Sequence, residues 1–463
     1  MTIRTSDDLR RDPTPAGATT TQPSGALPAT VVDVELSAPI DEILRHDGAK
    51  SFREAWLLVR VFDEPIALVK IPFPRGADRL DAATIGTAIA AHCGDAARTR
   101  IIDAGGDAAS ALAGDGTDVG KLPAFLAAHE RWRESGPEMT VAICTRNRAT
   151  DLRRALDSLR GQSYQRFTVL VVDNAPSDDS TRALVMSRPA DERIDYVEEP
   201  RPGLSWARNR ALEVVTTPVI AWLDDDEIAD RHWLIETAAA YCQNPDAAAV
   251  SGVVVPAELR TLPQLWFEEF GGHSKGRGFR PDRFTAADAR QPGGQSPLYP
   301  LPPFGVGANM SFDVQQLRAI GGFDNALGAG TLTQGGEDTL AFSQLLLAGG
   351  VIVYAPASVT RHFHRPDYAG LTHQMRGYGI GLTAYYTSLL RSNWRLLGPL
   401  LRLAPQALRD TGRGAGRGGG GAKTVPDSFP RELLRAKKKA MAQGPWLYLR
   451  ARRNASRLKA RSR

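Results

Sequence analysis

Three consecutive carboxylates, Asp224, Asp225 and Asp226, follow a short apolar run over residues 219–223. Adjacent negative charges repel one another, so folding gains nothing from gathering them at the end of a buried strand. A hard divalent cation such as Mn²⁺ or Mg²⁺ would neutralise them, because such ions bind carboxylate oxygens and phosphates. The alternative interpretation is a helix N-terminus, where carboxylates are also favourable. The pattern predicts a cation site at this strand end.

Two further groups of residues that could bind a cation or accept a proton lie C-terminal to these aspartates. Glu337 and Asp338 open a helix-like run over residues 339–347, either as a second acidic site or as an ordinary helix start. His362 and His364 follow an apparent strand over residues 351–354 and would face either one site or solvent. Imidazole is a common metal ligand, although a structural role is the alternative. Two separated acidic groups provide one carboxylate for a cation and another to accept a proton.

The elements that must position these residues read as alternating strands and helices. Residues 140–144 and 167–172 are apolar runs typical of buried strands, and residues 152–159 carry the apolar spacing of an amphipathic helix. This order predicts a βαβ unit in a parallel sheet, with ligands bound beyond the carboxyl ends of its strands. Three strand ends carry polar residues: Thr145 and Asn147, Asp173, and the three aspartates.

Taken together, these segments resemble a family 2 glycosyltransferase of the GT-A fold, over about residues 138–372. That resemblance implies an α/β, Rossmann-like, three-layer nucleotide-diphospho-sugar transferase domain. The motifs occur in the expected order, with Leu223-Asp-Asp-Asp226 similar to the DXD motif. The other matching segments are Cys144-Thr-Arg-Asn-Arg148, Val171-Val-Asp-Asn-Ala-Pro-Ser-Asp178, Gly203-Leu-Ser-Trp-Ala-Arg-Asn209, Gly307-Ala-Asn-Met-Ser-Phe312, Ile320-Gly-Gly-Phe-Asp324 and Gly336-Glu-Asp338. The chain departs from the usual pattern at Cys144, at Arg146 and at Ala175-Pro176.

The resemblance implies a role for each polar residue. Asp338 would be the general base that deprotonates an acceptor hydroxyl, supported by Glu337, in a one-step transfer with inversion. Asp226 and Asp224 would bind Mn²⁺ or Mg²⁺ together with His362, with His364 as the alternative ligand. The implied contacts to the nucleotide-sugar donor are Thr145, Asn147, Asp173, Arg208, Asp224 and Asp225.

The charge, cysteine content and hydropathy of the whole chain indicate where the protein is expected to work. The 463 residues carry a net charge of +5, but residues 412–463 contain 15 Lys and Arg against two acidic residues, so the remainder is acidic. Three dispersed cysteines exclude a disulfide scaffold, and neither a signal-peptide pattern nor an apolar run of membrane-spanning length is found. We therefore expect a cytoplasmic protein.

The domain organisation is predicted from changes in composition. Residues 1–29 are expected to be disordered, 30–135 to form a small α+β accessory domain, and 373–411 a helical segment. Residues 412–463 are expected to be a glycine-rich linker and a basic tail. Aromatic residues within 259–304 are expected either to shape the acceptor site or to hold a long loop.

Three other interpretations bear on the partners of the protein. A nucleotidyltransferase would carry a glycine-rich phosphate loop after its first strand, and residues 145–152 contain none. A non-catalytic protein that binds nucleic acid through the basic tail is disfavoured by the acidic body. Residues 391–409 combine an apolar and a basic stripe, which predicts a helix at an anionic membrane surface such as the inner face. Packing of this helix on the catalytic domain is the alternative.

Overall fold

The computed structural model describes residues 26–287, 296–298, 305–410 and 429–461. Its largest element is a mixed sheet in the order β9-β8-β7-β10-β14-β12-β15-β11, with β13 paired to β15. β7, β8, β9 and β10 run parallel, whereas β14 runs antiparallel to both of its neighbours. The strands are β7 (Met139–Thr145), β8 (Phe167–Asn174), β9 (Ile194–Glu199), β10 (Val219–Leu223), β11 (Glu227–Ala229), β12 (Ala247–Pro256), β13 (Asp282–Phe284), β14 (Asn309–Asp313) and β15 (Val351–His362).

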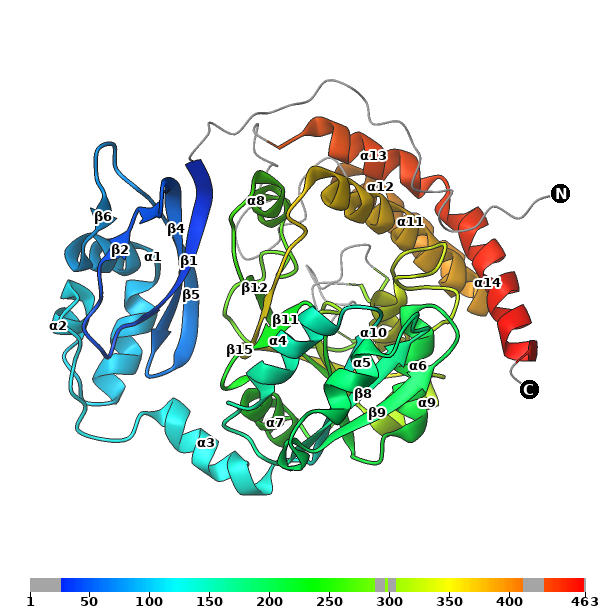
Figure 1. Cartoon of the computed structure of the whole chain (residues 1–463), viewed down its shortest axis with the longest axis horizontal. Helices are drawn as coiled ribbons and strands as arrows, with labels where there is room; N and C mark the ends of the chain where they lie inside the picture. Colours follow the sequence, from blue (N-terminus) through cyan, green and yellow to red (C-terminus); the bar gives the residue numbers. More distant parts are fainter. Residues whose placement is uncertain (1–25, 288–295, 299–304, 411–428, 462–463) are drawn as a thin grey trace.

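Helices cover both faces of this sheet and complete a three-layer α/β domain, as predicted (Figure 1). The consecutive β7 residues Val141 and Ala142 lie in different hydrophobic cores, because successive side chains of a strand point to opposite faces of the sheet. One core contains α4 (Ala149–Leu159), α5 (Ser180–Met186) and α7 (Trp233–Gln243). The other contains α6 (Leu204–Val214), α9 (Val314–Ala319) and α10 (Glu337–Leu347). The predicted βαβ unit is confirmed.

The N-terminal region has its own sheet and hydrophobic core. β4 (Lys50–Val61) and β5 (Glu64–Pro72) form an antiparallel hairpin, and β1 (Ala26–Glu35) pairs with β4 in parallel. The region also contains β2 (Ile43–Leu44), β3 (His46–Asp47), β6 (Arg79–Leu80), α1 (Ala82–Asp103), α2 (Ala108–Ala113) and α3 (Ala124–Ser135).

The first strand begins earlier than expected. Residues 26–29 were included in the predicted disordered segment, yet they belong to β1, because Leu27 pairs with Phe52 of β4. The rest of that predicted segment, residues 1–25, lies outside the described residues.

This N-terminal sheet packs against the strand that carries His362. Leu58 of β4 joins Val253, Val255 and Val359 in one buried cluster. Arg361 of β15 donates to Asp33 of β1 at 2.5 Å. The N-terminal region therefore stabilises the outer part of the catalytic sheet at its β12 and β15 strands.

The C-terminal segments differ from the sequence prediction. Residues 391–409 do not form one helix: α11 (Tyr368–Ser392) ends before Asn393, a turn spans Trp394–Leu396, and α12 (Leu397–Asp410) follows. Asn393 is extended and its side chain accepts a hydrogen bond from the Arg395 backbone, which begins the new turn.

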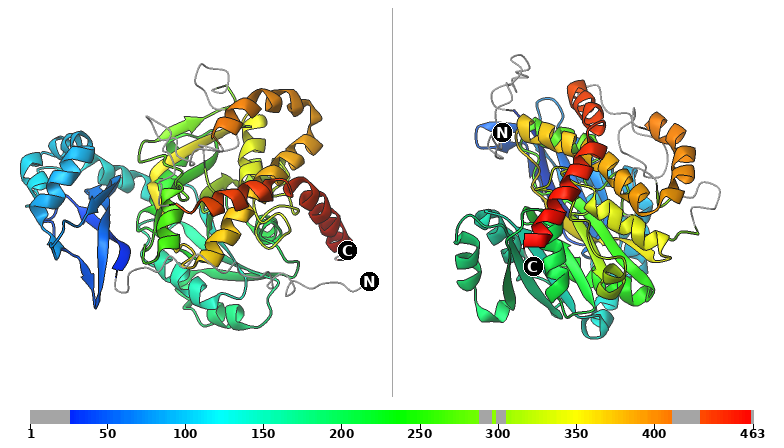
Figure 2. Two further views of the ribbon diagram at one scale, coloured as in Figure 1. Left: turned by 90° about the horizontal axis from the view of Figure 1, so that it is seen from above. Right: turned by 90° about the vertical axis from the view of Figure 1, so that its right-hand side faces the viewer.

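Part of the expected basic tail is also folded. Two amphipathic helices, α13 (Arg431–Met441) and α14 (Gly444–Arg461), pack along α11, where Leu433, Tyr448 and Ala451 are buried (Figures 1 and 2). Their basic residues do not prevent packing, because apolar residues occupy the inner face of each helix. The glycine-rich stretch 413–421 lies outside the described residues.

Candidate active site

A cavity of about 1220 Å³ opens beyond the carboxyl ends of β7 and β10, between the sheet and the C-terminal helices. Most of the polar residues predicted from the sequence line it. These are Thr145, Arg208, Asp224, Asp225, Asp226, Glu337, Asp338 and His362. Residues separated by more than 200 positions in the chain thus share one site.

Two of the predicted residues lie outside the cavity lining. Asn147 is exposed and its Oδ1 atom accepts a hydrogen bond from the Ser177 backbone at 3.0 Å. Asp173 is fully buried, accepts a hydrogen bond from the Tyr196 hydroxyl at 3.0 Å, and has a pKa raised by burial. The next residue, Asn174, lines the cavity instead, and its Oδ1 atom accepts from the Gly203 backbone at 2.9 Å.

Arg148 and Thr145 hold the middle aspartate. The Thr145 hydroxyl donates to Asp225 at 2.8 Å, and the Arg148 guanidinium donates to Asp225 at 2.5 Å and to Asp226 at 3.1 Å. Burial raises the pKa of Asp225 to about 7, although Arg148 opposes the shift. The sequence analysis did not include Arg148 among the site residues, although Arg148 is the last residue of the Cys144-Thr-Arg-Asn-Arg148 motif.

Asp226 lies beside a group of three histidines. Its Oδ1 atom is 3.3 Å from Nε2 of His362, while Nδ1 of His362 lies 3.0 Å from Nδ1 of His364. Burial favours the neutral form of Asp226, but His362 and Arg148 outweigh it and lower the pKa of this carboxyl. Glu268 accepts from Nε2 of His364 at 2.7 Å and so orients that ring.

The third histidine, His273, was not predicted. One potential ligand atom from each of His273, His362 and His364 lies within 4.8 Å of the others. The Nε2 atom of His273 is buried and, among the described residues, has no hydrogen-bond partner. A buried nitrogen without a partner is costly, whereas a cation beside Asp226 would give it one. No spacing in the sequence links His273 to the other two, since it comes from the loop after α8 (Leu262–Glu269).

Arg208 joins the two acidic groups. It is buried on α6, donates to Glu337 at 2.9 Å and lies 3.7 Å from Asp224. Burial raises the pKa of Glu337 to about 7, with Arg208 opposing the shift. Besides these two carboxylates, Arg208 donates a hydrogen bond to the Gly307 carbonyl oxygen at 3.3 Å, and its contact with a donor base or phosphate stays a prediction.

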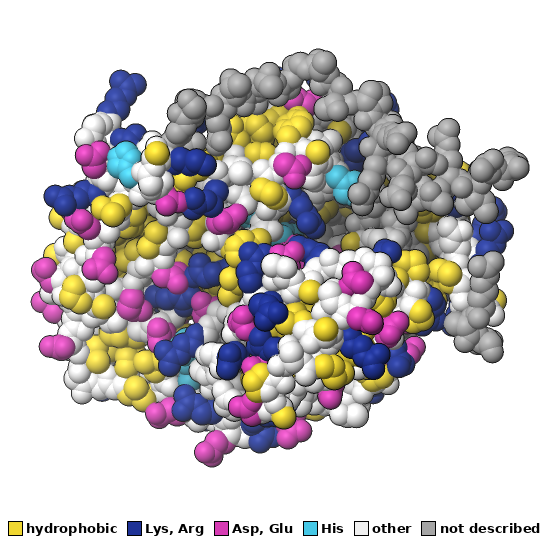
Figure 3. Space-filling view, in the orientation of Figure 1, with side chains coloured by type: hydrophobic (Ala, Val, Ile, Leu, Met, Phe, Trp, Pro, Cys, Tyr) yellow, Lys and Arg dark blue, Asp and Glu magenta, His cyan; other side chains and the backbone are white. Residues whose placement is uncertain are grey.

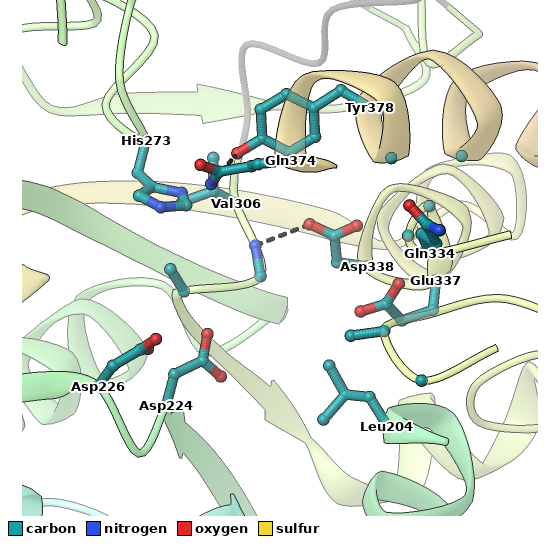
Figure 4. Close-up of a pocket in the computed structure, with 18 of the residues that line it drawn as sticks. Leu204, Asp224, Asp226, His273, Val306, Gln334, Glu337, Asp338, Gln374 and Tyr378 are labelled. Atoms are coloured by element: carbon teal, nitrogen blue, oxygen red, sulfur yellow. Dashed lines mark hydrogen bonds between the residues drawn. The ribbon is translucent and has the colours of Figure 1, made fainter. Parts of the chain in front are cut away.

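Asp338 lies across the cavity from the aspartate cluster (Figure 4). Its Oδ2 atom accepts a hydrogen bond from the Gly307 backbone at 2.8 Å, and Oδ1 accepts from the Thr339 backbone at 2.7 Å. A Cβ atom at Gly307 would lie 2.9 Å from the Asp338 carboxylate, so glycine is needed for this close approach. The first turn of α10 thereby fixes Asp338 towards the space that separates it from Asp224 and Asp226.

The opposite end of the cavity is aromatic and cationic. Tyr378 and Gln374 of α11 lie on the far side of Asp338 from the two aspartates (Figure 4), and Lys275 and Lys437 line the same cavity. Of the aromatic residues in the 259–304 segment, Phe270 lines the cavity, whereas Trp266 and Phe267 are buried in a core with α11. Tyr299 and Phe304 lie outside the described residues.

The site thus consists of a carboxylate cluster at the strand ends of an α/β sheet and a second carboxylate across the cavity. Residues 140–298 match the family model described as Glycosyl transferase family 2, so this part of the chain is similar to glycosyltransferases of that family.

Several known proteins are similar to parts of the chain. A glucosyl-dolichyl phosphate glucuronosyltransferase of Haloferax volcanii is 27% identical over 135 residues, 29% of this chain and 43% of the relative. A pre-mycofactocin glycosyltransferase of Mycobacterium tuberculosis is 29% identical over 246 residues, 50% of this chain and 44% of the relative. The chain thus spans less than half of these relatives. A mannosyltransferase from Pyrobaculum calidifontis, solved with GDP-Man and Mn²⁺, superposes with a TM-score of 0.41 at 20% identity, covering 73% of this chain and 82% of that one.

Proposed function

We propose that the protein transfers a sugar from a nucleotide-diphosphate sugar to an acceptor hydroxyl, with inversion and with the help of a divalent cation. The observation that carries this proposal is the placement of Asp338 across one cavity from Asp224 and Asp226. A single displacement requires that the diphosphate leaves from one side of the sugar and that a proton acceptor lies on the other side. The family match supports the reaction class.

The residues present fit a cation. Asp226 and His362 offer an oxygen and a nitrogen that lie 3.3 Å apart, and the unpartnered Nε2 of His273 adds a further donor nearby. A mixed carboxylate and imidazole set suits Mn²⁺ better than Mg²⁺, which prefers oxygen ligands. When bound, the cation would neutralise charge on the departing diphosphate. Asp224 and Asp226, together with His362, would hold this cation.

The residues of the chain itself perform the proton transfer. Asp338 accepts backbone hydrogen bonds from Gly307 and Thr339, which fix its carboxylate in the direction of the acceptor side. Glu337 supports it from the same helical turn through the buried pair with Arg208. A carboxylate held in this way can accept the hydroxyl proton as the oxygen attacks the sugar.

A panel of nucleotide-diphosphate sugars tests the proposal. The full chain should hydrolyse one member slowly in the presence of Mn²⁺, and hydrolysis should stop with EDTA and return when Mn²⁺ is added. With an acceptor supplied, the anomeric configuration of the product, read by NMR, should be inverted relative to the donor. Full activity in EDTA, or retention of configuration, would contradict the mechanism.

A peripheral position on the inner face of a membrane, on the cytoplasmic side, is a further part of the proposal. None of the described helices is long and apolar enough to cross a bilayer. Trp394, Leu397 and Leu401 are nevertheless 76%, 48% and 64% exposed, and the exposed Arg395 and Arg402 lie among them. Apolar side chains flanked by arginines favour an anionic lipid surface. The name of the Haloferax relative includes a lipid-linked phosphate, and a lipid-linked acceptor would be reached from such a position.

Co-sedimentation tests this attachment. The full chain should bind phosphatidylglycerol vesicles at low salt and be released at high salt, whereas Trp394→Ser combined with Leu401→Ser should bind at least tenfold more weakly. Equal partition of both proteins would contradict it.

A further inference from the structure

Two lysines that line the cavity form no direct ion pair with an acidic side chain among the described residues. Lys275 comes from the loop after α8, and Lys437 comes from α13. Among the described residues neither ammonium group forms an ion pair or a hydrogen bond with a side chain. Each ammonium group instead faces an aromatic ring. The Lys275 ammonium lies 5.1 Å from the centroid of the Tyr378 ring, and the Lys437 ammonium lies 4.8 Å from the centroid of the Phe270 ring.

The carboxylates closest to Lys275 are already engaged. Glu268 accepts a hydrogen bond from His364, and Asp338 accepts from Gly307 and Thr339. Both act on Lys275 at longer range, while Lys437 repels it. Two like charges facing one half-buried space destabilise each other unless an anion lies between them.

The position of this pair relates it to the reacting centre. Tyr378, whose ring Lys275 faces, lies on the far side of Asp338 from Asp224 and Asp226 (Figure 4). Both lysines line the cavity, and Lys437 comes from the C-terminal helix α13. Figure 3 shows Lys and Arg side chains near the middle of the face drawn there, with Asp and Glu side chains among them.

We propose that Lys275 and Lys437 form a binding subsite for a phosphate or diphosphate group of the acceptor. This rests on the proposed transfer reaction, and it adds that the acceptor is anionic. The two ammonium groups match the charge of a phosphate dianion, and Tyr378 and Phe270 provide aromatic surface beside it. The folded C-terminal region thereby supplies part of the substrate site through Lys437.

Anion binding by the full chain, kept in EDTA to leave the carboxylate cluster without cations, tests the subsite. Inorganic phosphate and octyl phosphate are titrated by calorimetry, with octyl glucoside as the neutral probe. Lys275→Met and Lys437→Met should each weaken binding of either phosphate roughly tenfold or more, as expected for loss of one charged hydrogen bond. Lys438→Met is the matched control, since Lys438 is exposed on the same helix. Lys437→Arg should retain binding and shows that the helix remains folded.

The outcomes separate the sources of the phosphate. Tighter binding of octyl phosphate than of inorganic phosphate supports a lipid-linked acceptor, and equal binding supports a water-soluble phosphorylated one. Phosphate binding that is absent, or equal in the wild type and the Lys275→Met/Lys437→Met double variant, overturns the subsite. Nucleotide-sugar hydrolysis by the unmodified chain is measured separately, so its failure would overturn the proposed function without reference to the lysines.

Discussion

The two ends of the cavity balance their charges in opposite ways. At the strand ends, Asp225 and Asp226 are held by Arg148 and His362, and Arg208 joins Asp224 to Glu337. At the helical end, Lys275 and Lys437 face aromatic rings and, within the described part of the chain, lack acidic partners. The first end is organised before any ligand arrives, whereas the second is completed only by an anion. A preorganised set of charges is suited to chemistry, and an uncompensated set is suited to binding.

The largest effect is expected at the residue between the two ends. Asp338→Asn should lower the rate of transfer by about 10²–10⁴-fold, because the amide cannot accept the acceptor proton. Donor binding, measured by calorimetry with the nucleotide diphosphate and Mn²⁺, should not change. Equal loss of donor binding would place Asp338 with the donor end and contradict its role as the base.

Removal of the buried Arg208 guanidinium, which joins Asp224 to Glu337, should lower the free energy of unfolding. Arg208→Met leaves Glu337 and Asp224 without their buried partner and should lower the free energy of unfolding by about 3–5 kcal/mol, measured with urea. Arg210→Met on the same helix removes an exposed pair with Glu213 and should change it by about 0.5 kcal/mol or less. Similar values for the two variants would show that the donor end is not held together by Arg208.

Cation affinity should depend on the histidines in a graded way. His362→Ala should weaken Mn²⁺ binding roughly 100-fold, and His273→Gln should weaken it about tenfold. Free Mn²⁺ is counted by EPR, which requires no turnover. Exposed His92, on α1, is the control site, and His92→Gln should leave the affinity unchanged. An unchanged affinity in His273→Gln would exclude this histidine as a ligand.

The smallest effect concerns pH at the helical end. Burial, helped by Lys438, lowers the pKa of Lys437 to about 8, so this lysine is charged below pH 8 and loses its charge as the pH rises through it. Sulfate, which remains a dianion throughout, should bind several-fold more weakly at pH 9.5 than at pH 6.5. Lys437→Arg should lessen this decline, because arginine remains charged, whereas Lys275, whose pKa burial also lowers to about 8, still loses its charge. A wild-type profile that is flat to pH 9.5 would mean that Lys437 has an ordinary pKa and no contact with the anion.

Local sequence patterns were sufficient for the parallel strands β7, β8 and β10 and for the carboxylates. Buried strands over residues 140–144, 167–172 and 219–223 are continuous apolar runs, and polar residues must follow where such strands reach the surface. Asp224 directly follows β10, Asp226 directly precedes β11, and Asp338 lies in the first turn of α10, so each could be found near the end or the start of an element. Glu337 was found for the same reason.

Some residues of the site are marked by no local sequence pattern, and only the tertiary structure showed that they belong to it. His273 reaches the histidine group from a loop, Arg148 bridges two aspartates, and Lys437 enters the cavity from a helix that composition alone marked as a basic tail. The helix predicted over residues 391–409 was divided at Asn393. Periodicity and composition determine which face of an element is apolar, but which distant element packs on that face depends on contacts between residues far apart in the chain. For this reason the sequence alone indicated the carboxylates at the strand ends, whereas tertiary packing decided which histidine, arginine and lysine side chains join them in the cavity.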